Sequence, residues 1–294
     1  MKNSLLLLTT FFSVLSSNVF SQQKEVTIIS EKLTENIYVL KGQGGNIGIF
    51  VGENGVFMID DQFAPLSKKI LATIKTITTK PITYLINTHW HGDHTGGNAN
   101  FQKEGAVIVS HENVRKRMSI EQVIRGKKRP ASPKEALPVI TFSKDIQFYI
   151  DEEPIMITHI HNAHTDGDAL VYFGNSNVLH VGDAYFQGKF PYIDLNSGGT
   201  IDGYIDGIEK IIMIADDATK IIPGHGNVSS EKELKVYLSM LKDLKNTIIS
   251  EIEKGASLEE VKNNSLLTEK YKNYNGWITE EKIKEAIYKS LKMN

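Results

Sequence analysis

The chain has 294 residues, of which 40% are hydrophobic and 23 are glycine, and this length can bury the core of one large globular domain. Its 33 basic and 35 acidic side chains give a net charge of -2, so no basic excess favours binding to nucleic acid. The sequence has no cysteine, which excludes disulfides, thiolate metal ligands and cysteine nucleophiles.

Residues 1–21 have the layout of a cleavable secretory signal peptide. Lys2 supplies a short positive region, two apolar runs follow, and Ser21 provides a small residue at the expected cleavage point. The apolar part is too short for a stable membrane span, with an uncleaved anchor as the alternative. We therefore expect a mature chain from about Gln22, without a stable span, in a periplasm or outside the cell.

The region before residue 88 predicts strands and one helix. Short apolar runs predict strands at 26–29, 37–40, 46–51 and 56–59, and Asn54-Gly55 is a strong hairpin signal between the last two. Apolar residues at helical spacing predict a helix over 66–77, which Pro81 ends. The apolar run 82–86 predicts a buried strand that leads directly into the next motif.

The stretch Thr88–Gly97 combines three histidines, one aspartate and three glycines. His89 and His91, two positions apart on extended backbone, can converge on one metal ion if the chain turns between them. Asp93 and His94 then point elsewhere, where a second metal is the natural occupant. The alternative is a polar loop with incidental histidines, but this density of metal-ligand residue types is hard to obtain by chance.

The rest of the chain repeats short strands and helices in two similar halves. We expect helices at 98–101, 111–118, 201–214 and 231–254, and strands at 106–109, 139–142, 146–150, 155–159, 169–173, 178–181 and 220–222. Gly126–Pro130 predicts an exposed loop, and residues 127–138 form either a lid over the site or an ordinary loop. The expected division is a signal at 1–21, one domain at 22–255 and a helical extension at 256–294.

Further candidate ligands stand in loops at the ends of other predicted strands. These are His164, Asp183 and His225, together with Asp60, for which a helix cap or turn carboxylate is the alternative. Strand ends that carry ligands in both halves predict an α/β fold with two sheets face to face and helices outside. The site would lie in the crevice at the strand ends.

This combination resembles the metallo-β-lactamase superfamily over roughly residues 37–228. The resemblance rests on Asp60, the Thr88–Gly97 motif, His164 in Ala-His-Thr-Asp-Gly-Asp, Gly182-Asp183 and Gly224-His225-Gly226. It implies an αββα sandwich of two mixed β-sheets flanked by helices. It also implies two metal ions per chain, expected to be zinc, with iron or manganese as the alternatives.

The resemblance further implies two sets of three ligands and one carboxylate that bridges both metals. These are His89, His91 and His164 for the first metal, Asp93, His94 and His225 for the second, and Asp183 as the bridge. Asp60 would accept a hydrogen bond from a ligand imidazole and fix its tautomer. Two zinc ions can lower the pKa of a shared water enough to give a metal-bound hydroxide, which would attack an acyl carbon. Asp93 is the expected catalytic residue, because it would orient that hydroxide and carry its proton.

Two residues near these ligands are candidates for contact with a substrate. Tyr185 follows Asp183 closely and could stack on a substrate or donate to a carbonyl, with core packing as the alternative. His161 precedes His164 and could lie at the rim, with an exposed or hydrogen-bonded structural histidine as the alternative.

Differences between this sequence and particular branches of the superfamily narrow the range of expected functions. Branches with a cysteine ligand are excluded, and the bridging position of Asp183 looks like that of glyoxalase II and the acyl-homoserine lactonases. Expected export argues against a cytosolic glutathione thioester, and the segment 182–200 resembles exported hydrolases close to the β-lactamase-like group. We expect an exported dinuclear zinc-dependent hydrolase that attacks a small-molecule ester, lactone or amide. The alternatives are a β-lactamase and, further away, an iron-dependent persulfide dioxygenase or a non-catalytic metal-binding protein.

Overall fold

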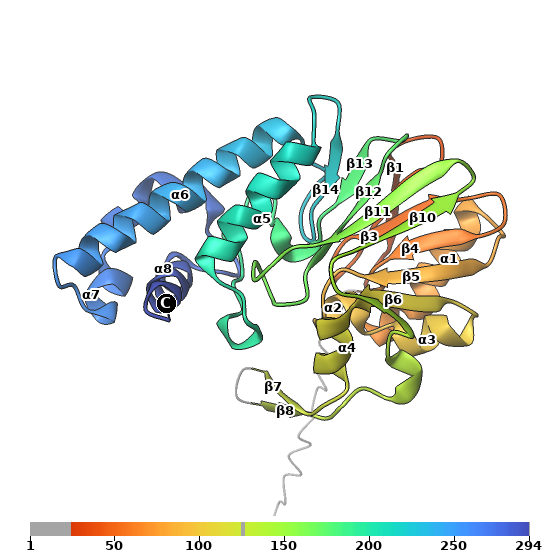
Figure 1. Cartoon of the computed structure of the whole chain (residues 1–294), viewed down its shortest axis with the longest axis horizontal. Coiled ribbons are helices and arrows are strands. Elements are labelled where there is room, and N and C mark those ends of the chain that lie inside the picture. The colour runs from red at the N-terminus through yellow and green to blue at the C-terminus, as the bar shows by residue number, and fades with distance from the viewer. Residues whose placement is uncertain (1–24, 125–126, 294) are drawn as a thin grey trace, which may run out of the picture.

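The computed structural model describes residues 25–124 and 127–293, so the expected signal at 1–21 lies outside the described residues. Two β-sheets pack face to face between layers of helices (Figure 1), which confirms the expected α/β sandwich. Within the described part of the chain, no helix is long and apolar enough to cross a membrane.

The first sheet has seven strands in the order β1-β2-β3-β4-β5-β6-β9. The strands are β1 (Ile29–Lys32), β2 (Ile37–Lys41), β3 (Ile47–Val51), β4 (Val56–Ile59), β5 (Ile82–Asn87), β6 (Val107–His111) and β9 (Ile140–Phe142). Pairing is antiparallel from β1 to β4 and parallel from β4 to β9, so the sheet is mixed.

The second sheet has five strands in the order β10-β11-β12-β13-β14. The strands are β10 (Asp145–Ile150), β11 (Glu153–His159), β12 (Ala169–Phe173), β13 (Val178–His180) and β14 (Lys220–Ile222). All neighbours are antiparallel except β13 and β14, which run parallel, so this sheet is mixed as well.

Helices flank the two sheets (Figure 1). They are α1 (Ser67–Ile77), α2 (Gly92–Thr95), α3 (Asn98–Lys103), α4 (Glu112–Met118), α5 (Ile201–Ile214), α6 (Glu231–Glu253), α7 (Leu258–Asn263) and α8 (Glu280–Leu291). Ile70 and Ile74 of α1 pack on the first sheet, whereas Ile208 of α5 and Ile287 of α8 belong to the core beyond the second. A third apolar layer, which includes Phe57 and Phe173, fills the space between the two sheets.

Two local expectations differ from the structure. The strand expected at 26–29 lies at Ile29–Lys32, because this exposed edge strand is positioned by pairing with β2 rather than by a buried apolar face. The expected exposed loop after Gly126 is wrong in part, since β7 (Gln122–Ile124) and β8 (Lys127–Arg129) pair as a small antiparallel sheet. Lys127, Lys128 and Arg129 are exposed, as expected for solvated side chains.

The strand ends that carry polar side chains meet at one edge of the sandwich. Asp60 follows β4 and the histidine motif follows β5, and these two strands are parallel neighbours. Asp183 and His225 follow β13 and β14, the parallel pair of the second sheet. Because parallel strands end at the same edge, side chains distant in sequence converge on one crevice.

Candidate metal centre

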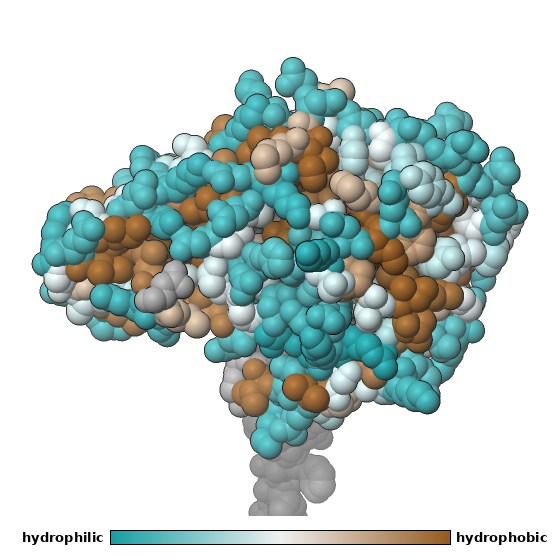
Figure 2. Space-filling view, in the orientation of Figure 1, coloured by the Kyte–Doolittle hydropathy of each residue, from teal (hydrophilic) through white to brown (hydrophobic). Residues whose placement is uncertain are grey.

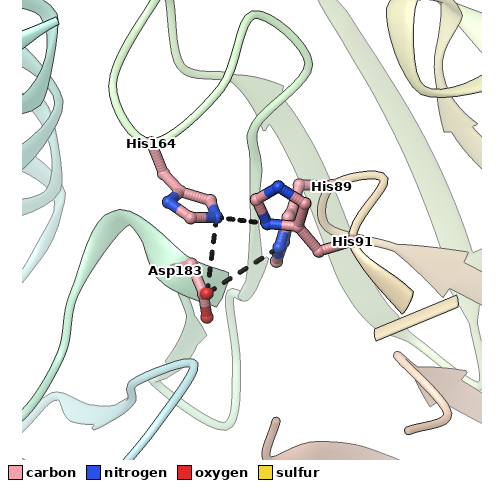
Figure 3. Close-up of side chains that lie close together, drawn as sticks. All are labelled: His89, His91, His164 and Asp183. Carbon is pink, nitrogen blue, oxygen red and sulfur yellow. Dashed lines mark hydrogen bonds and ion pairs between the residues drawn. The ribbon is translucent and has the colours of Figure 1, made fainter. Parts of the chain in front are cut away.

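Four side chains form the first group at this edge (Figure 3). They are His89, His91, His164 and Asp183, and one ligand atom from each lies within 4.8 Å of all the others. His164 Nε2 is 2.8 Å from His91 Nδ1 and 3.4 Å from Asp183 Oδ2. His89 Nε2 is 3.8 Å from the same oxygen of Asp183. Three imidazoles and one carboxylate therefore point at a common space.

Asp93, His94 and His225 form the second group, with ligand atoms that also lie within 4.8 Å of one another. Asp93 Oδ2 is 3.4 Å from His225 Nε2 and 3.8 Å from His94 Nε2. The Nε2 atoms of the two histidines are 3.4 Å apart. The motif after β5 thus sends His89 and His91 to one group and Asp93 and His94 to the other.

Asp183 connects the two groups. Its Oδ2 atom faces His89 and His164, whereas its Oδ1 atom lies 3.1 Å from His94 Nε2 and 3.4 Å from His225 Nε2. One carboxylate that offers a separate oxygen to each group has the position of a bridging ligand for two cations.

Hydrogen bonds from outside the groups orient the imidazoles. His94 Nδ1 lies 2.7 Å from Asp60 Oδ2, and Asp60 also accepts from the backbone N–H and the hydroxyl of Thr88. His164 Nδ1–H donates to the carbonyl of Tyr192 at 2.6 Å, which leaves its Nε2 as the inward-facing acceptor. A bond of this kind on the far nitrogen fixes both the ring and the tautomer of a metal ligand.

The donor set fits two metal ions. Among the described residues, His89 Nε2 and Asp183 Oδ1 are buried and have no hydrogen-bond partner, although buried polar atoms are nearly always paired. Imidazole nitrogens and carboxylate oxygens are preferred ligands of zinc. Cations in the two groups would satisfy both unpaired atoms.

Electrostatics in the first group favours the protonation states that metal binding needs. Burial alone would raise the pKa of Asp183, but the surrounding histidines hold it well below the ordinary value. Burial lowers the pKa of His89 strongly and that of His164 to about 4. The carboxylate of Asp183 is therefore ionised and the imidazoles of His89 and His164 are neutral, which are the forms that bind a cation.

In the second group, by contrast, the nearby carboxylates raise the pKa values of the histidines. Although burial opposes it, Asp183 raises the pKa of His94 strongly and that of His225 to about 9. Burial would raise the pKa of Asp93, but the neighbouring histidines lower it to about 2. A metal ion that binds here must displace the protons of these histidines.

Two glycines bring bare backbone against the groups. A Cβ atom on Gly45 would collide with the ring of His94, and one on Gly224 would collide with Asp183 Oδ1. The Gly224 N–H donates to the carbonyl of Gly182, which holds the His225 loop against Asp183. Close approach of the two loops therefore requires glycine at both positions.

A cavity of about 1000 Å³ opens above the two groups. His91, Asp93, Asp183 and His225 line its base, and most of the remaining lining is apolar or aromatic. Polar groups that converge at the base of an apolar cavity are the usual arrangement of a small-molecule site.

The two candidate substrate-facing residues lie away from this cavity lining. Tyr185 is buried in the core against Tyr237, with its hydroxyl 3.0 Å from that of Ser229, so the core-packing alternative describes its position. His161 is exposed and packs its ring on His159 at 4.3 Å, which matches its structural alternative. The neighbouring Phe186 lines the cavity instead and stacks on His225.

Asp194 contacts the candidate ligand His91, and the sequence did not indicate this contact. Its Oδ2 atom is 3.0 Å from His91 Nε2 and accepts a hydrogen bond from the hydroxyl of Ser197. Burial would raise the pKa of Asp194, but the contacts with His91 and Ser197 lower it to about 2. An ionised carboxylate thus orients His91 with its Nδ1 atom toward the first group.

A sandwich of two mixed sheets with this donor set at its edge is the architecture of a metal-dependent hydrolase family. Residues 40–225 match the family model described as the metallo-beta-lactamase superfamily, and the chain belongs to this superfamily.

Individual relatives are distant. The chain is 21% identical to a metallo-beta-lactamase type 2 of Bacteroides fragilis over 77% of this chain and 90% of that protein. It is 29% identical to a hydroxyacylglutathione hydrolase of Polaromonas sp. over 55% of each chain. A solved metallo-beta-lactamase from Pontibacter korlensis has a TM-score of 0.63 and 19% identity, over 74% of this chain and all of that one (100%). These relatives are hydrolases of the same superfamily, and the structural likeness shows the shared fold.

Proposed function

We propose that the protein is an exported, dinuclear zinc-dependent hydrolase that attacks the acyl carbon of an ester, lactone or amide. The observation that carries this proposal is the position of Asp183, whose two carboxylate oxygens face separate groups of ligands. Such a bridge supports a pair of metal ions at the spacing that dinuclear hydrolysis uses.

The residues around the groups divide the chemical work. Two zinc ions held there would lower the pKa of a shared water and polarise an acyl carbonyl. Asp93 lines the cavity and is 28% exposed at its side chain, so it can hold a water and accept its proton. Asp183 is 5% exposed and occupied by four histidines, so its charge positions the groups rather than moving a proton. Asp93 is therefore the proposed catalytic residue.

Metal content and hydrolysis test the proposal together. We expect the gently purified mature protein to contain about two zinc ions per chain and to lose hydrolysis on chelation, with recovery when zinc is restored. Metal binding to the folded state should also raise the melting temperature in proportion to the logarithm of free zinc. Less than one metal per chain would contradict the dinuclear site. Iron together with oxygen consumption would favour the dioxygenase alternative.

A substitution at Asp93 tests its catalytic role, with metal content measured beside activity because Asp93 also belongs to the second ligand group. Asp93→Asn keeps the size of the side chain but removes the proton acceptor, so we expect hydrolysis to fall by about 100-fold or more. Asp217→Asn, at an exposed position remote from the cavity, is the matched control. Full activity of Asp93→Asn with two metals retained would exclude the proposed role of Asp93.

β-Lactam hydrolysis is the second candidate function. The match to the Bacteroides fragilis metallo-beta-lactamase covers 90% of that protein and favours it. A chromogenic cephalosporin measured beside a panel of lactones, esters and thioesters distinguishes the candidates by their values of kcat/KM.

Export has its own test. The proposed signal at 1–21 predicts that the mature protein begins near Gln22 and is recovered outside the cytoplasm. Mass spectrometry of the N-terminal peptide from cell fractions checks both points. An intact N-terminus in a cytoplasmic fraction would contradict export without affecting the hydrolase proposal.

A further inference from the structure

The cavity is larger than the reacting atoms of an acyl substrate need. Its volume of about 1000 Å³ lies at the upper end of the range for small-molecule sites, which is about 300–1,000 Å³. Besides residues of the ligand groups, its lining includes side chains from two other parts of the chain, around β7–β8 and before α8. A non-reacting portion of the substrate can therefore fill the space above the metal groups.

The first wall comes from the segment that precedes α8. Trp277 lines the cavity, and its ring makes an edge contact with Tyr192 at 5.3 Å. Tyr192 in turn stacks on His91 at 5.8 Å, and its carbonyl accepts the hydrogen bond from His164. Trp277 lies outside the 40–225 segment that the family model matches. This wall is thus a feature of this chain's C-terminal part, placed directly beside the first group.

The second wall comes from the residues around β7 and β8. Met118, Ile120 and Pro130 line the cavity on this side. Figure 2 shows hydrophobic side chains at the end of the molecule where Figure 1 draws the β7–β8 hairpin. Arg129, Pro130 and Pro133, from the segment 127–138, also border the cavity.

Both walls hold apolar surface open to solvent. Trp277 is 53% exposed and Ile120 is 60% exposed, although both residues line a cavity. Covering apolar surface removes it from water and is favourable, so a ligand with its own apolar group gains affinity here. A small polar ligand would leave both surfaces in water.

We propose that the protein selects acyl substrates with a bulky apolar or aromatic group, which Trp277 and Ile120 hold from opposite walls above the metal groups. This inference rests on the proposed hydrolase function. It names the class of substrate for which the cavity is shaped, and it makes Trp277 and Ile120 residues that determine specificity.

Binding of two carboxylates to the zinc-loaded protein tests the inference without turnover. Acetate and 4-phenylbutyrate share the carboxylate of an acyl product and differ in the apolar group, and calorimetry gives both dissociation constants. We expect 4-phenylbutyrate to bind about tenfold tighter or more, which corresponds to about 1.4 kcal/mol. Trp277→Ala and Ile120→Ala should each reduce this ratio about threefold or more and leave acetate within about twofold.

Matched controls come from exposed residues beside each wall. Leu266→Ala lies in the C-terminal segment and Val123→Ala in β7, and both side chains are exposed but outside the cavity lining. We expect neither control to change the ratio. Equal affinities of the wild type for the two carboxylates would overturn the inference. So would Trp277→Ala and Ile120→Ala variants that keep the wild-type ratio, because the apolar group would then bind without either side chain.

Turnover separates this inference from the proposed function. For esters of one alcohol, we expect kcat/KM to be about tenfold higher with the 4-phenylbutyryl group than with the acetyl group. If neither ester nor any other acyl compound is hydrolysed but the binding ratio persists, the hydrolase proposal fails and the cavity preference stands. If both esters are hydrolysed equally well, the hydrolase proposal stands and the inference is wrong.

Discussion

The carboxylate of Asp183 is buried, yet it contacts histidines from both ligand groups. Its backbone carbonyl accepts a hydrogen bond of 2.6 Å from the hydroxyl of the buried Tyr204, which fixes the segment that carries it. Burial without these partners would favour the neutral acid, but the histidines keep the pKa well below the ordinary value. The contacts of Asp183 with these histidines thus keep one negative charge buried between the two ligand groups.

Asp183→Asn tests whether Asp183 bridges the two ligand groups. The amide has the size of the carboxylate but neither its charge nor its second ligand oxygen, so we expect the second metal to be lost. Activity should fall by about 100-fold or more, since even residues that only orient ligands cost about 10–100-fold. Metal analysis and kcat measure the two effects, and retention of two metals would contradict the bridging role.

Asp194 should act on the first group only, because it reaches His91 and not the second group. Asp194→Asn removes the charge that orients the imidazole, and we expect affinity for the first metal to fall about 10–100-fold. Competition with a zinc-binding dye measures the two dissociation constants separately. Ser197→Ala, which removes only one hydrogen bond to Asp194, should have a smaller effect. Equal weakening of both metals would indicate a general structural defect.

The residues expected to bind metals could be found from sequence because each stands beside a turn at the end of an apolar strand. The structure brings all seven together, and their role as ligands stays a prediction. Asp194 could not be found in this way, since it lies 103 positions from His91 and carries no local pattern. Contacts that depend on where a distant loop packs are set by tertiary structure.

At the scale of elements, the prediction from sequence was most accurate where a strong apolar run lies between two turn signals. Strands 56–59, 169–173 and 220–222 and the helix 201–214 have the bounds that the sequence predicts. β1 and β8 are exposed along their length, so periodicity did not place either strand correctly. The parallel neighbours β6 and β9 were beyond local reasoning, because a long connection separates them.

Two strands that belong to different sheets meet through stacked histidines. His111 ends β6 and His159 ends β11, and their rings stack at 3.8 Å. Burial lowers the pKa of His111 and lowers that of His159 to about 4. Both rings are therefore neutral in the folded protein at pH values where an unfolded chain would already be protonated.

This stack predicts a loss of stability in acid. The folded pKa lies below the unfolded value of about 6.5, so stability is constant above that pH and declines as pH falls toward about 4. For His159 alone the loss should reach roughly 2–3 kcal/mol. His159→Asn keeps a donor for the carbonyl of Asp168 and should reduce this decline. Urea unfolding of the two metal-free proteins between pH 7 and pH 4.5 measures the difference, and parallel curves would refute the assignment.

At the scale of the whole molecule, the C-terminal helices belong to the apolar core that lies beyond the second sheet. Ile283 and Ile287 of α8 lie in the same core as residues of α5 and α6. The division of the chain at residue 255 stays a prediction, but this packing indicates that the last segment stabilises the second sheet's outer layer. The same segment carries Trp277. The packing of this segment on the core therefore affects both the free energy of unfolding and the position of the cavity wall.

Ile287→Ala tests this structural role. Its side chain is fully buried, and truncation should reduce the free energy of unfolding by about 2–5 kcal/mol. Met293→Ala, at a position that is 61% exposed, should change it by about 0.5 kcal/mol or less. Equal effects of the two substitutions in urea unfolding would show that the C-terminal helices are an independent appendage.

Because Gly45 and Gly224 lie against the candidate ligands, the site is sensitive even to their substitution by alanine. A single added methyl group at either position meets His94 or Asp183, although neither glycine supplies a ligand atom. In a comprehensive mutational scan, both positions should therefore tolerate as few substitutions as the histidines do. Substitutions in the cavity walls would change substrate selection, whereas an added side chain at Gly45 or Gly224 would displace the candidate ligands themselves.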